Sequence, residues 1–587
     1  MLKSSKLNLL IALLIGIILA LIFSNNSTQA QQTSNAPWIT GRVHDKQNQA
    51  VVGATVALIA PNKTEPLAET TTQPDGRYAL VLPDTIIYGD ADKVSVGHIV
   101  LPLQDFLPNG LSIHIERSHF KSTNLSLSED IIKSLRSGST LIIPDFTLQR
   151  HINPAFWIAT LIFVVVLVFI ATGIFHNTLS ALIGVSLLFL ASYLGHPLYE
   201  GLFIFDFPAA LNYIDWNVIF LIMGMMIIIA VIENTGIFQW LAFFAYRVSG
   251  GRMFVLLPIL MLITGVASAF LDNVTTMLLM TPITVQIAIA VGINPLALLI
   301  PEVMASNVIG VSTLVGTPTN ILIGSYGGIS FNDFMQNLTP GVLLAFVGLV
   351  IYSSLVYRKD LAKAHGTSEL LMEKLAERGR ITEPGHLKKA GWVGAGMLIM
   401  FVFGEKIHLL PAVTALIGAT ALMVWIKPNI DEMIEAVDWT TLVFFMSLFM
   451  VVGAIQEVGL ISYIADSIGK LVGDNLMLAM LVVTWVSAIL SMLIANIPFT
   501  AAMLPVVGYL TATIPGAENQ ALFFCLSVGA AMGGNGSLIG ASANMVTAGI
   551  SEAAGYPISY SYFMKKGLPA LFITVALSSL WLLLRFL

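Results

Sequence analysis

The sequence predicts a polytopic α-helical membrane protein that is preceded by a small β-sandwich domain. Of its 587 residues, 56% are hydrophobic and 11% are charged, whereas about 25% of the residues of a typical soluble protein are charged. Apolar stretches of about 20 residues, long enough to cross a bilayer, recur after residue 155. Residues 31–150 differ, because they hold 10 Lys or Arg and 12 Asp or Glu among short alternating segments.

Composition and motifs argue against several classes of function. The net charge of −6 leaves no basic footprint of the kind that binds nucleic acid. A single cysteine, Cys525, cannot form an internal disulfide or a cysteine-based zinc site. The sequence contains no P-loop, HExxH or GxSxG motif, which argues against ATP-driven transport and against the commonest hydrolases. We therefore expect no enzyme activity, no cofactor and no tightly bound metal.

Residues 1–30 predict a signal peptide. Lys3 and Lys6 precede an apolar run over 7–23, and polar residues ending at Ala30 follow it, which is the order of a secretory signal. The run is long for a signal core, so an uncleaved anchor is the alternative. In either case the residues that follow are expected on the outer side of the membrane.

Residues 31–150 predict the extracytoplasmic β-sandwich. Alternating apolar positions over 51–58 and 74–82 are bounded by Asp-Gly and Pro signals, which is typical of short strands and turns. The segments GRVHD, GATVAL and PDGRYAL resemble the carboxypeptidase-regulatory-like module, which implies a small sandwich. Four scattered histidines form no ligand pattern, so a structural or partner-binding role is expected: His44, His98, His114 and His119.

Ten apolar stretches predict membrane spans. They lie near 155–175, 180–195, 217–233, 295–323, 340–356, 391–404, 410–426, 440–456, 521–549 and 567–586. Two further apolar regions, 253–291 and 476–511, are interrupted by polar residues and proline. We expect each of these two regions to form a helical hairpin that enters and leaves by the same face of the membrane.

Residues 151–356 and 391–587 predict two copies of one unit, joined by a charged cytoplasmic linker over 357–390. Matching residues keep an offset of 223, then 224, then 229: Asp215/Asp438, Gly236/Gly459, Asn273/Asn496, Pro282/Pro505, Gly316/Gly540, Asn320/Asn544 and Pro340/Pro569. Five spans in the first copy place the start of the second on the opposite side, so the repeats are expected to be inverted. The predicted inner loops hold 13 Lys or Arg and the outer ones 4, as the positive-inside rule requires. Inverted repeats are typical of secondary transporters, whose site lies at mid-membrane.

The hairpin turns are the first candidate binding elements. Such turns leave backbone groups unpaired, which a membrane tolerates only beside protein or a water-filled cavity. Their amide and hydroxyl oxygens can replace water around a cation, and the helix N-termini beyond them can face an anion. The alternative is that the turns merely cap their helices. The candidates are Asp272, Asn273, Thr275 and Thr276 in the first hairpin and Asn496, Pro498 and Thr500 in the second.

The second candidate elements are polar stretches that interrupt a long span in each half. Glycine and proline unwind a helix there and let the backbone approach an ion closely. The competing interpretation is close helix packing through small residues. The candidates are Ser306, Asn307, Thr313, Gly316, Thr317 and Asn320 in the first half and Asn535, Gly536, Ser537 and Asn544 in the second.

Two acids are candidates for proton coupling. A carboxylate near the bilayer centre costs about 2.5–3.5 kcal/mol on insertion scales, so an acid that remains there is a functional candidate. Asp272 lies at the first hairpin turn, and its repeat counterpart is Ala495. Glu302 lies within a span, just before Ser306. A buried helix cap is the alternative for Asp272, and an ion-pair partner is the alternative for Glu302.

Three motifs resemble the ion-transporter superfamily: LDNVTTMLLMTPIT, STLVGTPTNILIGS and GGNGSLIGASANMV. The similar branch is that of the melanosomal P protein, arsenite efflux permeases and sodium/proton antiporters, with citrate and dicarboxylate transporters more distant. Over about residues 155–587 the resemblance implies a homodimer with a scaffold and a moving transport part, and it implies that the candidate residues form two half-sites. Sodium/dicarboxylate members carry Ser-Asn-Thr at the hairpin turns, whereas this chain has Asp-Asn-Val and Ala-Asn-Ile-Pro. The departure favours proton or cation antiport, or anion export.

The leading hypothesis is a secondary ion transporter of the bacterial inner membrane, coupled to H⁺ or Na⁺. Its partners would be a small ion and the bilayer, and arsenite, chloride, sodium, citrate and sulfate all remain open as solutes. A receptor that senses an external ligand through residues 31–150 is the alternative, as is a channel of the same fold. Deleting 31–150 separates the first two, since a transporter should retain its flux.

Overall fold

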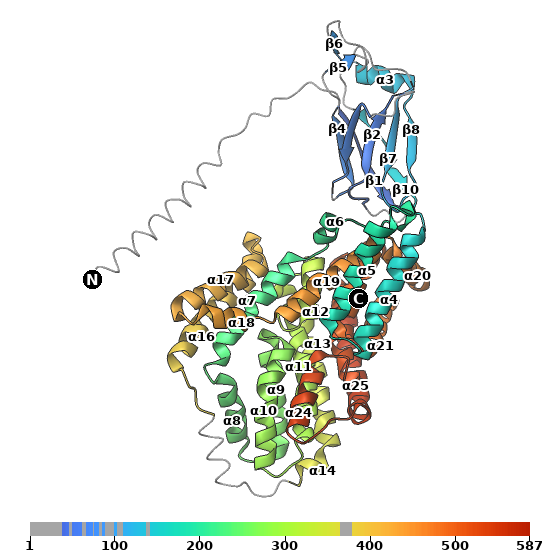
Figure 1. The fold of residues 1–587 in the computed structure, drawn as a ribbon. Coiled ribbons are helices and arrows are strands. Elements are labelled where there is room, and N and C mark those ends of the chain that lie inside the picture. The colour runs from blue at the N-terminus through green and yellow to red at the C-terminus, as the bar shows by residue number, and fades with distance from the viewer. Residues whose placement is uncertain are drawn as a thin grey trace, which may run out of the picture. The chain divides into compact units, whose positions relative to one another are not determined.

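The computed structural model describes residues 38–45, 50–60, 66–73, 75–81, 85–88, 99–102, 110–136, 141–363 and 379–587. The chain divides into two compact units, Met1–His151 and Ile152–Leu587 (Figure 1). The predicted signal peptide, residues 1–30, lies outside the described residues.

The first unit contains two four-stranded sheets. One sheet has β1 (Trp38–Asp45) paired with β4 (Arg77–Val81), β9 (Leu141–Ile142) and β10 (Phe146–Leu148). The other has the order β3 (Ala68–Thr71), β2 (Thr55–Ile59), β7 (Ser112–Glu116) and β8 (Thr123–Ser126). A separate hairpin of β5 (Thr85–Tyr88) and β6 (Ile99–Pro102) and the helix α3 (Glu129–Arg136) complete its regular elements in the described residues.

Alternate residues of both sheets form one apolar core. Val56, Ile113 and Leu80 are fully buried members of it, as expected for strands with one face inward. Gly41 lies opposite Tyr78 in the β1–β4 pair, and a Cβ at Gly41 would lie 2.7 Å from the Tyr78 hydroxyl oxygen. Burial raises the pKa of Tyr78 to about 12. The predicted β region is confirmed, and its resemblance to the carboxypeptidase-regulatory-like module stays a prediction.

The second unit is helical, and its elements follow one order twice. The first half contains α4 (Pro154–Thr172), α5 (Asn177–Leu190), α6 (Phe207–Asn212), α7 (Trp216–Glu233), α8 (Ile237–Ser249), α9 (Met253–Phe270), α10 (Asn273–Ala290), α11 (Leu296–Ile309), η3 (Gly310–Ser312), α12 (Pro318–Gly327) and α13 (Phe331–Val356). The second contains α16 (Pro384–Phe403), α17 (Pro411–Ile426), α18 (Ile430–Glu435), α19 (Trp439–Glu457), α20 (Leu460–Val472), α21 (Leu476–Leu493), α22 (Asn496–Thr513), α23 (Ala521–Gly533), η6 (Gly534–Gly536), α24 (Ser542–Ala553) and α25 (Tyr560–Phe586). Among the described residues, ten helices are long and apolar enough to cross a membrane.

The packing of the two halves is reciprocal. Helix α10 contacts α24, and its counterpart α22 contacts α12; α7 contacts α17, and α19 contacts α5. The counterparts α8 and α20 lie toward opposite ends of the helical unit, and so do α12 and α24 (Figure 1). Reciprocal contacts with ends exchanged are what an inverted repeat requires.

Several boundaries differ from the sequence-based expectation. Helices α13 and α25 begin before 340 and 567, because Ser330 and Ser559 cap about two additional turns of mixed polarity at each start. The spans expected over 295–323 and 521–549 are each divided by a 3₁₀ turn, η3 or η6. The short helices α8 and α20 occupy segments where the sequence predicted no element.

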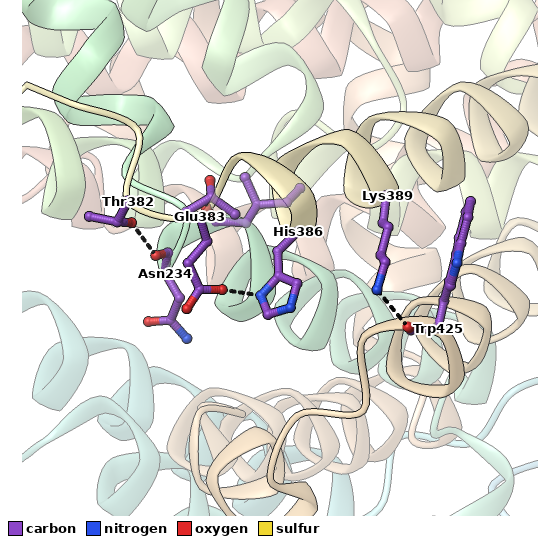
Figure 2. A network of polar contacts seen from close by, with 8 residues as sticks. Asn234, Thr382, Glu383, His386, Lys389 and Trp425 are labelled. Carbon is purple, nitrogen blue, oxygen red and sulfur yellow. Dashed lines mark hydrogen bonds and ion pairs between the residues drawn. The ribbon is translucent and has the colours of Figure 1, made fainter.

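The end of the expected linker packs against the helices (Figure 2). Thr382 Oγ1 donates to the Asn234 carbonyl at 2.9 Å, directly after α7. Helix α16 begins within the expected linker, at Pro384. Near its start His386 pairs with Glu383, and Lys389 Nζ donates to the Trp425 carbonyl of α17 at 3.1 Å. These contacts attach the start of the second repeat to α7 and α17.

Candidate functional site

The first hairpin turn is closed by Asp272, which is the N-cap of α10. Its Oδ1 accepts hydrogen bonds from the Val274 and Thr275 amides, each at 2.9 Å. Its Oδ2 accepts from Thr275 Oγ1 at 2.5 Å. The Thr276 hydroxyl donates to the Asp272 carbonyl at 2.8 Å. These are the bonds of a capping aspartate, and the side chain is half-buried.

The second hairpin turn is held by the backbone. Ala495 is the N-cap of α22 and offers no side-chain acceptor. The Asn496 amide instead donates to the Gly540 carbonyl at 3.3 Å. The Thr500 hydroxyl donates to the Asn496 carbonyl at 2.7 Å. The second turn is therefore attached directly to the unwound segment of its own half.

The unwound segments follow η3 and η6 and make matching bonds in both halves. Asn320 Nδ2 donates to the carbonyls of Val311 and Thr313, at 2.9 and 2.8 Å. Asn544 Nδ2 donates to those of Gly534 and Ser537, at 2.7 and 2.9 Å. Each asparagine therefore satisfies carbonyls that the interruption of the helix leaves without an amide partner.

Each hairpin packs closely on the unwound segment of its own half. One glycine in each segment, Gly316 or Gly540, lies so close to the hairpin backbone that a side chain would not fit there. A Cβ at Gly316 would lie 2.9 Å from the Ser268 carbonyl oxygen of α9, and one at Gly540 would lie 3.1 Å from the Ser491 carbonyl oxygen of α21. Thr313 Oγ1 donates to the Ala269 carbonyl near the first turn. Two backbones approach closely at each glycine, which explains why both halves carry one there.

Four asparagines, Asn273, Asn307, Asn535 and Asn544, connect the two halves, and we call them the junction cluster. Asn273 Nδ2 donates to Asn307 Oδ1 at 2.9 Å. Asn307 Nδ2 then donates across the repeat boundary to Asn535 Oδ1 at 3.0 Å and Asn544 Oδ1 at 3.1 Å. All four side chains are buried. The first hairpin turn is thereby linked to the unwound segment of the second half.

One donor of the junction cluster is unpaired. Within the described residues, Asn535 Nδ2 is buried and has no hydrogen-bond partner. A buried donor group without a partner costs about 1–3 kcal/mol, and the two N–H bonds of Asn535 Nδ2 are therefore available to an acceptor.

A second bond between the halves lies beside the cluster. Ser527 Oγ of α23 donates to Asn320 Oδ1 of α12 at 2.6 Å. The side-chain amide nitrogen of Asn320 donates within its own unwound segment, and Ser527 of the opposite repeat donates to the side-chain oxygen of Asn320.

Nearly all predicted site residues are buried. Asp272 and Thr275 are half-buried, and the others are buried: Asn273, Thr276, Ser306, Asn307, Thr313, Gly316, Thr317, Asn320, Asn496, Pro498, Thr500, Asn535, Gly536, Ser537 and Asn544. Hydrogen bonds bring together Asn273, Asn307, Asn535 and Asn544, whereas Pro498 and Thr500 stay within the second hairpin. Glu302 is fully buried in α11.

Sequence reasoning missed four polar residues that take part in this region. Ser268 bonds Ser306, Ser491 Oγ donates to the Ala530 carbonyl at 2.5 Å, Thr264 bonds Glu302, and Ser527 bonds Asn320. Ser268 and Ser491 share the repeat offset of 223, and that signal could have found them. Thr264 corresponds to Ser487 at the same offset, so the signal extends to it, whereas Ser527 corresponds to Val303 and has no such signal.

Two cavities share three lining positions that the repeat offset relates, and the smaller one is also lined by residues of the first half such as Tyr213 and Leu322. One, of about 300 Å³, is lined by Glu233, Leu278 and Pro282 among others. The other, of about 90 Å³, is lined by residues that include Gln456 and Pro505, which are the repeat counterparts of Glu233 and Pro282. Since the repeats are inverted, these cavities belong to opposite ends of the helical unit.

Comparison with known proteins agrees with this architecture. A sequence model of the citrate transporter family matches residues 165–529. An uncharacterised transporter of Mycobacterium tuberculosis is 38% identical over 374 residues, which cover 64% of this chain and 87% of the relative. The human P protein is 32% identical and covers 74% of this chain, which spans 60% of that protein. An uncharacterised transporter of Synechocystis is 32% identical over 72% of this chain and 95% of its own length. These matches confirm the expected resemblance, and the chain is a multi-pass membrane protein that belongs to the citrate transporter family.

Proposed function

We propose that this protein is a secondary active transporter that moves a small ion by alternating access at the junction cluster. The driving force would be a proton or sodium gradient across the plasma membrane. The solute class that fits the cluster is a small anion with oxygen acceptors.

The unpaired amide of Asn535 carries this proposal. It is a buried hydrogen-bond donor between the two inverted halves, where only an acceptor would satisfy it. The nearby helices α12 and α24 begin just after the unwound segments, and helix N-termini attract negative charge. Export of an anion and anion uptake both fit this chemistry.

The unequal cavities support alternating access. The cavities beside Pro282 and Pro505 have volumes of about 300 and 90 Å³. In an inverted repeat, exchanging the conformations of the halves closes one side and opens the other. The larger cavity would then lie on the side that is open in this conformation.

The orientation and assembly are also part of the proposal. We place the β unit outside the cell and the segment 357–390 inside, because Lys and Arg concentrate in the loops predicted to be cytoplasmic. A homodimer, with one transport site in each protomer, is the expected assembly.

Flux measurements on purified protein in liposomes test the function. Arsenite, chloride, sodium, citrate and sulfate would each be offered with an imposed proton gradient and then with a sodium gradient. At least one solute should move in a gradient-dependent way. If no solute moves, or if the conductance is that of an open pore, the proposed function is wrong.

The variant Asn307→Ala tests the site. It leaves three amide groups of the cluster without their partner, so we expect flux to fall by about tenfold or more, equivalent to about 1.4 kcal/mol. The control is Asn212→Ala, since Asn212 is an exposed asparagine at the end of α6. Equal flux in both variants would remove the junction cluster from the transport path.

A further inference from the structure

Glu302 is a fully buried acid outside the junction cluster. It lies in α11, one helical turn before Ser306, and none of its surface is exposed. Helix α11 packs against both arms of the first hairpin, α9 and α10. A carboxyl at this place is costly unless it is neutral or paired.

The hydrogen bonding of Glu302 is incomplete. Thr264 Oγ1 of α9 donates to Glu302 Oε1 at 2.6 Å. Thr284 of α10 provides a second hydroxyl beside the carboxyl. Among the described residues, neither Glu302 Oε2 nor Thr284 Oγ1 has a hydrogen bond of regular geometry. A proton on Oε2 could be donated to Thr284 Oγ1, and without that proton the Thr284 hydroxyl could donate to Oε2, so the pocket accommodates both forms of the acid.

Within the described residues, no charged group compensates a carboxylate at Glu302. The described helices α9 and α10 contain no Asp, Glu, His, Lys or Arg. The other elements that contact α11 carry these titratable residues: Asp333 and Tyr352 on α13, Cys525 on α23, Glu552 on α24, and Tyr560, Tyr562, Lys565, Lys566 and Arg585 on α25. In the described part of the chain, none of them acts on Glu302, whose polar neighbours are the two hydroxyls.

Among the described residues, the acid and Thr284 of this pocket have no polar counterpart in the second half, although Thr264 corresponds to the buried Ser487. At the repeat offsets of 223 and 224, the counterparts of Glu302 and Thr284 are Leu526 and Val507, both of which are buried. The second half therefore builds the same helix contacts without an acid. Packing alone does not require a carboxyl here, so a function is the better explanation.

We propose that Glu302 is the site at which transport is coupled to protons. The inference rests on the proposed function and names its coupling ion. Glu302 takes a proton from the aqueous side to which the transport part is open, carries it as a neutral acid and releases it on the other side. The pocket favours a proton over a hard cation such as sodium, because its polar neighbours among the described residues are two hydroxyls, which with the carboxyl provide four oxygens, fewer than the six or more that hard cations take.

Asp272 has the opposite environment. Two backbone amides and one hydroxyl donate to its carboxylate, so both of its oxygens are used in capping the helix. We therefore assign Asp272 to holding the turn and Glu302 to carrying the proton.

Infrared difference spectroscopy of the full chain in nanodiscs tests the protonation directly. We expect the carbonyl stretch of a protonated carboxylic acid, sensitive to deuterium exchange and lost on alkaline titration. Glu302→Gln should remove this band, and Glu552→Gln, which changes an exposed acid of α24, should leave it. Thr264→Val should shift the band, because it removes the hydrogen bond to Oε1. If the wild-type band is absent, or if Glu302→Gln leaves it unchanged, the proposal is wrong.

Proton movement tests the coupling. A pH-sensitive dye trapped in proteoliposomes would report protons moved by gradients of citrate, chloride or sodium. Glu302→Gln should reduce this proton movement by about tenfold or more, while exchange of the solute at equal concentrations stays within about twofold of wild type. Glu302→Leu, which copies Leu526, is the second variant if the first does not fold. The proposal would be overturned if proton movement persists in the variant. It would also be overturned if the flux depends on Glu302 and is driven by sodium while no protons move.

The two arms distinguish the possible failures. If no solute moves in any protein, the proposed function fails and the coupling role fails with it, while the infrared band still decides whether Glu302 is a protonated buried acid. If solute moves and protons do not, transport stands and the assignment of Glu302 is wrong.

Discussion

Asp272 carries a carboxylate at a hairpin turn, and its bonds define what its replacement should do. Asparagine can still accept the Val274 and Thr275 amides, so Asp272→Asn should fold and retain proton-coupled flux. Alanine removes the cap, which lowers stability by about 1 kcal/mol. Thermal unfolding in nanodiscs measures the second effect, and the dye assay measures the first. A stable Asp272→Asn protein that has lost proton movement would return the coupling role to Asp272.

Single residues differ in how far the sequence could identify them. Asn273, Asn320 and Asn544 were predicted because polar residues recur at one place in two apolar repeats. Asn307 and Asn535 were predicted as candidates as well, but the bond between them was not, since they are 228 positions apart and occupy places that do not correspond in the two repeats. A lone hydroxyl such as Thr264 looks the same in sequence whether it bonds its own helix or an acid 38 positions away.

At the level of elements, the packing of the second hairpin depends on how closely the backbone of its first helix, α21, approaches the neighbouring helix α23. Helix α21 packs against α23, where a Cβ at Gly533 would lie 2.5 Å from the Ala488 carbonyl oxygen. Backbone cannot move aside as a flexible side chain can. The separation of these two helices is therefore set by glycine.

A pair of glycine substitutions measures this effect. Gly533→Ala should destabilise the protein by about 1–3 kcal/mol, because the added methyl group overpacks a close backbone contact. Gly549→Ala is the control: this glycine lies in α24 with nothing within 4 Å of an added Cβ. It should be neutral or raise stability by about 0.5–1 kcal/mol, since alanine favours a helix. The readout is the unfolding temperature of each variant, and equal destabilisation by both would refute the packing argument.

Element prediction succeeded where hydrophobic length was the signal. The spans were found because about 20 apolar residues in sequence have few alternatives to a membrane helix. The helices α8 and α20 have 13 residues each, which is shorter than the roughly 20 apolar residues that mark a span. Their mixture of polar and apolar residues is also typical of a loop. The unwinding within the spans was predicted from glycine and proline, but the turns η3 and η6 needed the structure.

At the scale of the molecule, function depends on inversion, because only inverted copies can exchange roles across a membrane. The sequence indicated inversion by counting spans and cationic loops. The structure adds the reciprocal contacts of α10 with α24 and of α22 with α12. It also adds what no count supplies, namely which side chains of the two halves meet. Tertiary contacts between distant segments are set by the whole fold and leave no local pattern in one sequence.

Equivalent residues of α8 and α20 provide a direct test of inversion. Arg247 and Lys470 are separated by the repeat offset of 223, are both exposed and lie near the ends of their helices. Lys470 pairs with Asp466 on its own helix, and an exposed pair of this kind contributes little to stability. Arg247→Cys and Lys470→Cys should therefore both fold. Cys525 is fully buried, so the unmodified chain should remain unlabelled and serves as the background.

An impermeant maleimide added to intact cells should label Lys470→Cys and leave Arg247→Cys unlabelled until the membrane is permeabilised. The physical reason is that counterparts in inverted repeats lie on opposite faces, and the cation count places α8 inside. Labelling of Arg247→Cys alone would keep the inversion and reverse the orientation of the whole chain. Labelling of both variants from one side would mean parallel repeats, and a transport cycle based on exchange between inverted halves would then be untenable.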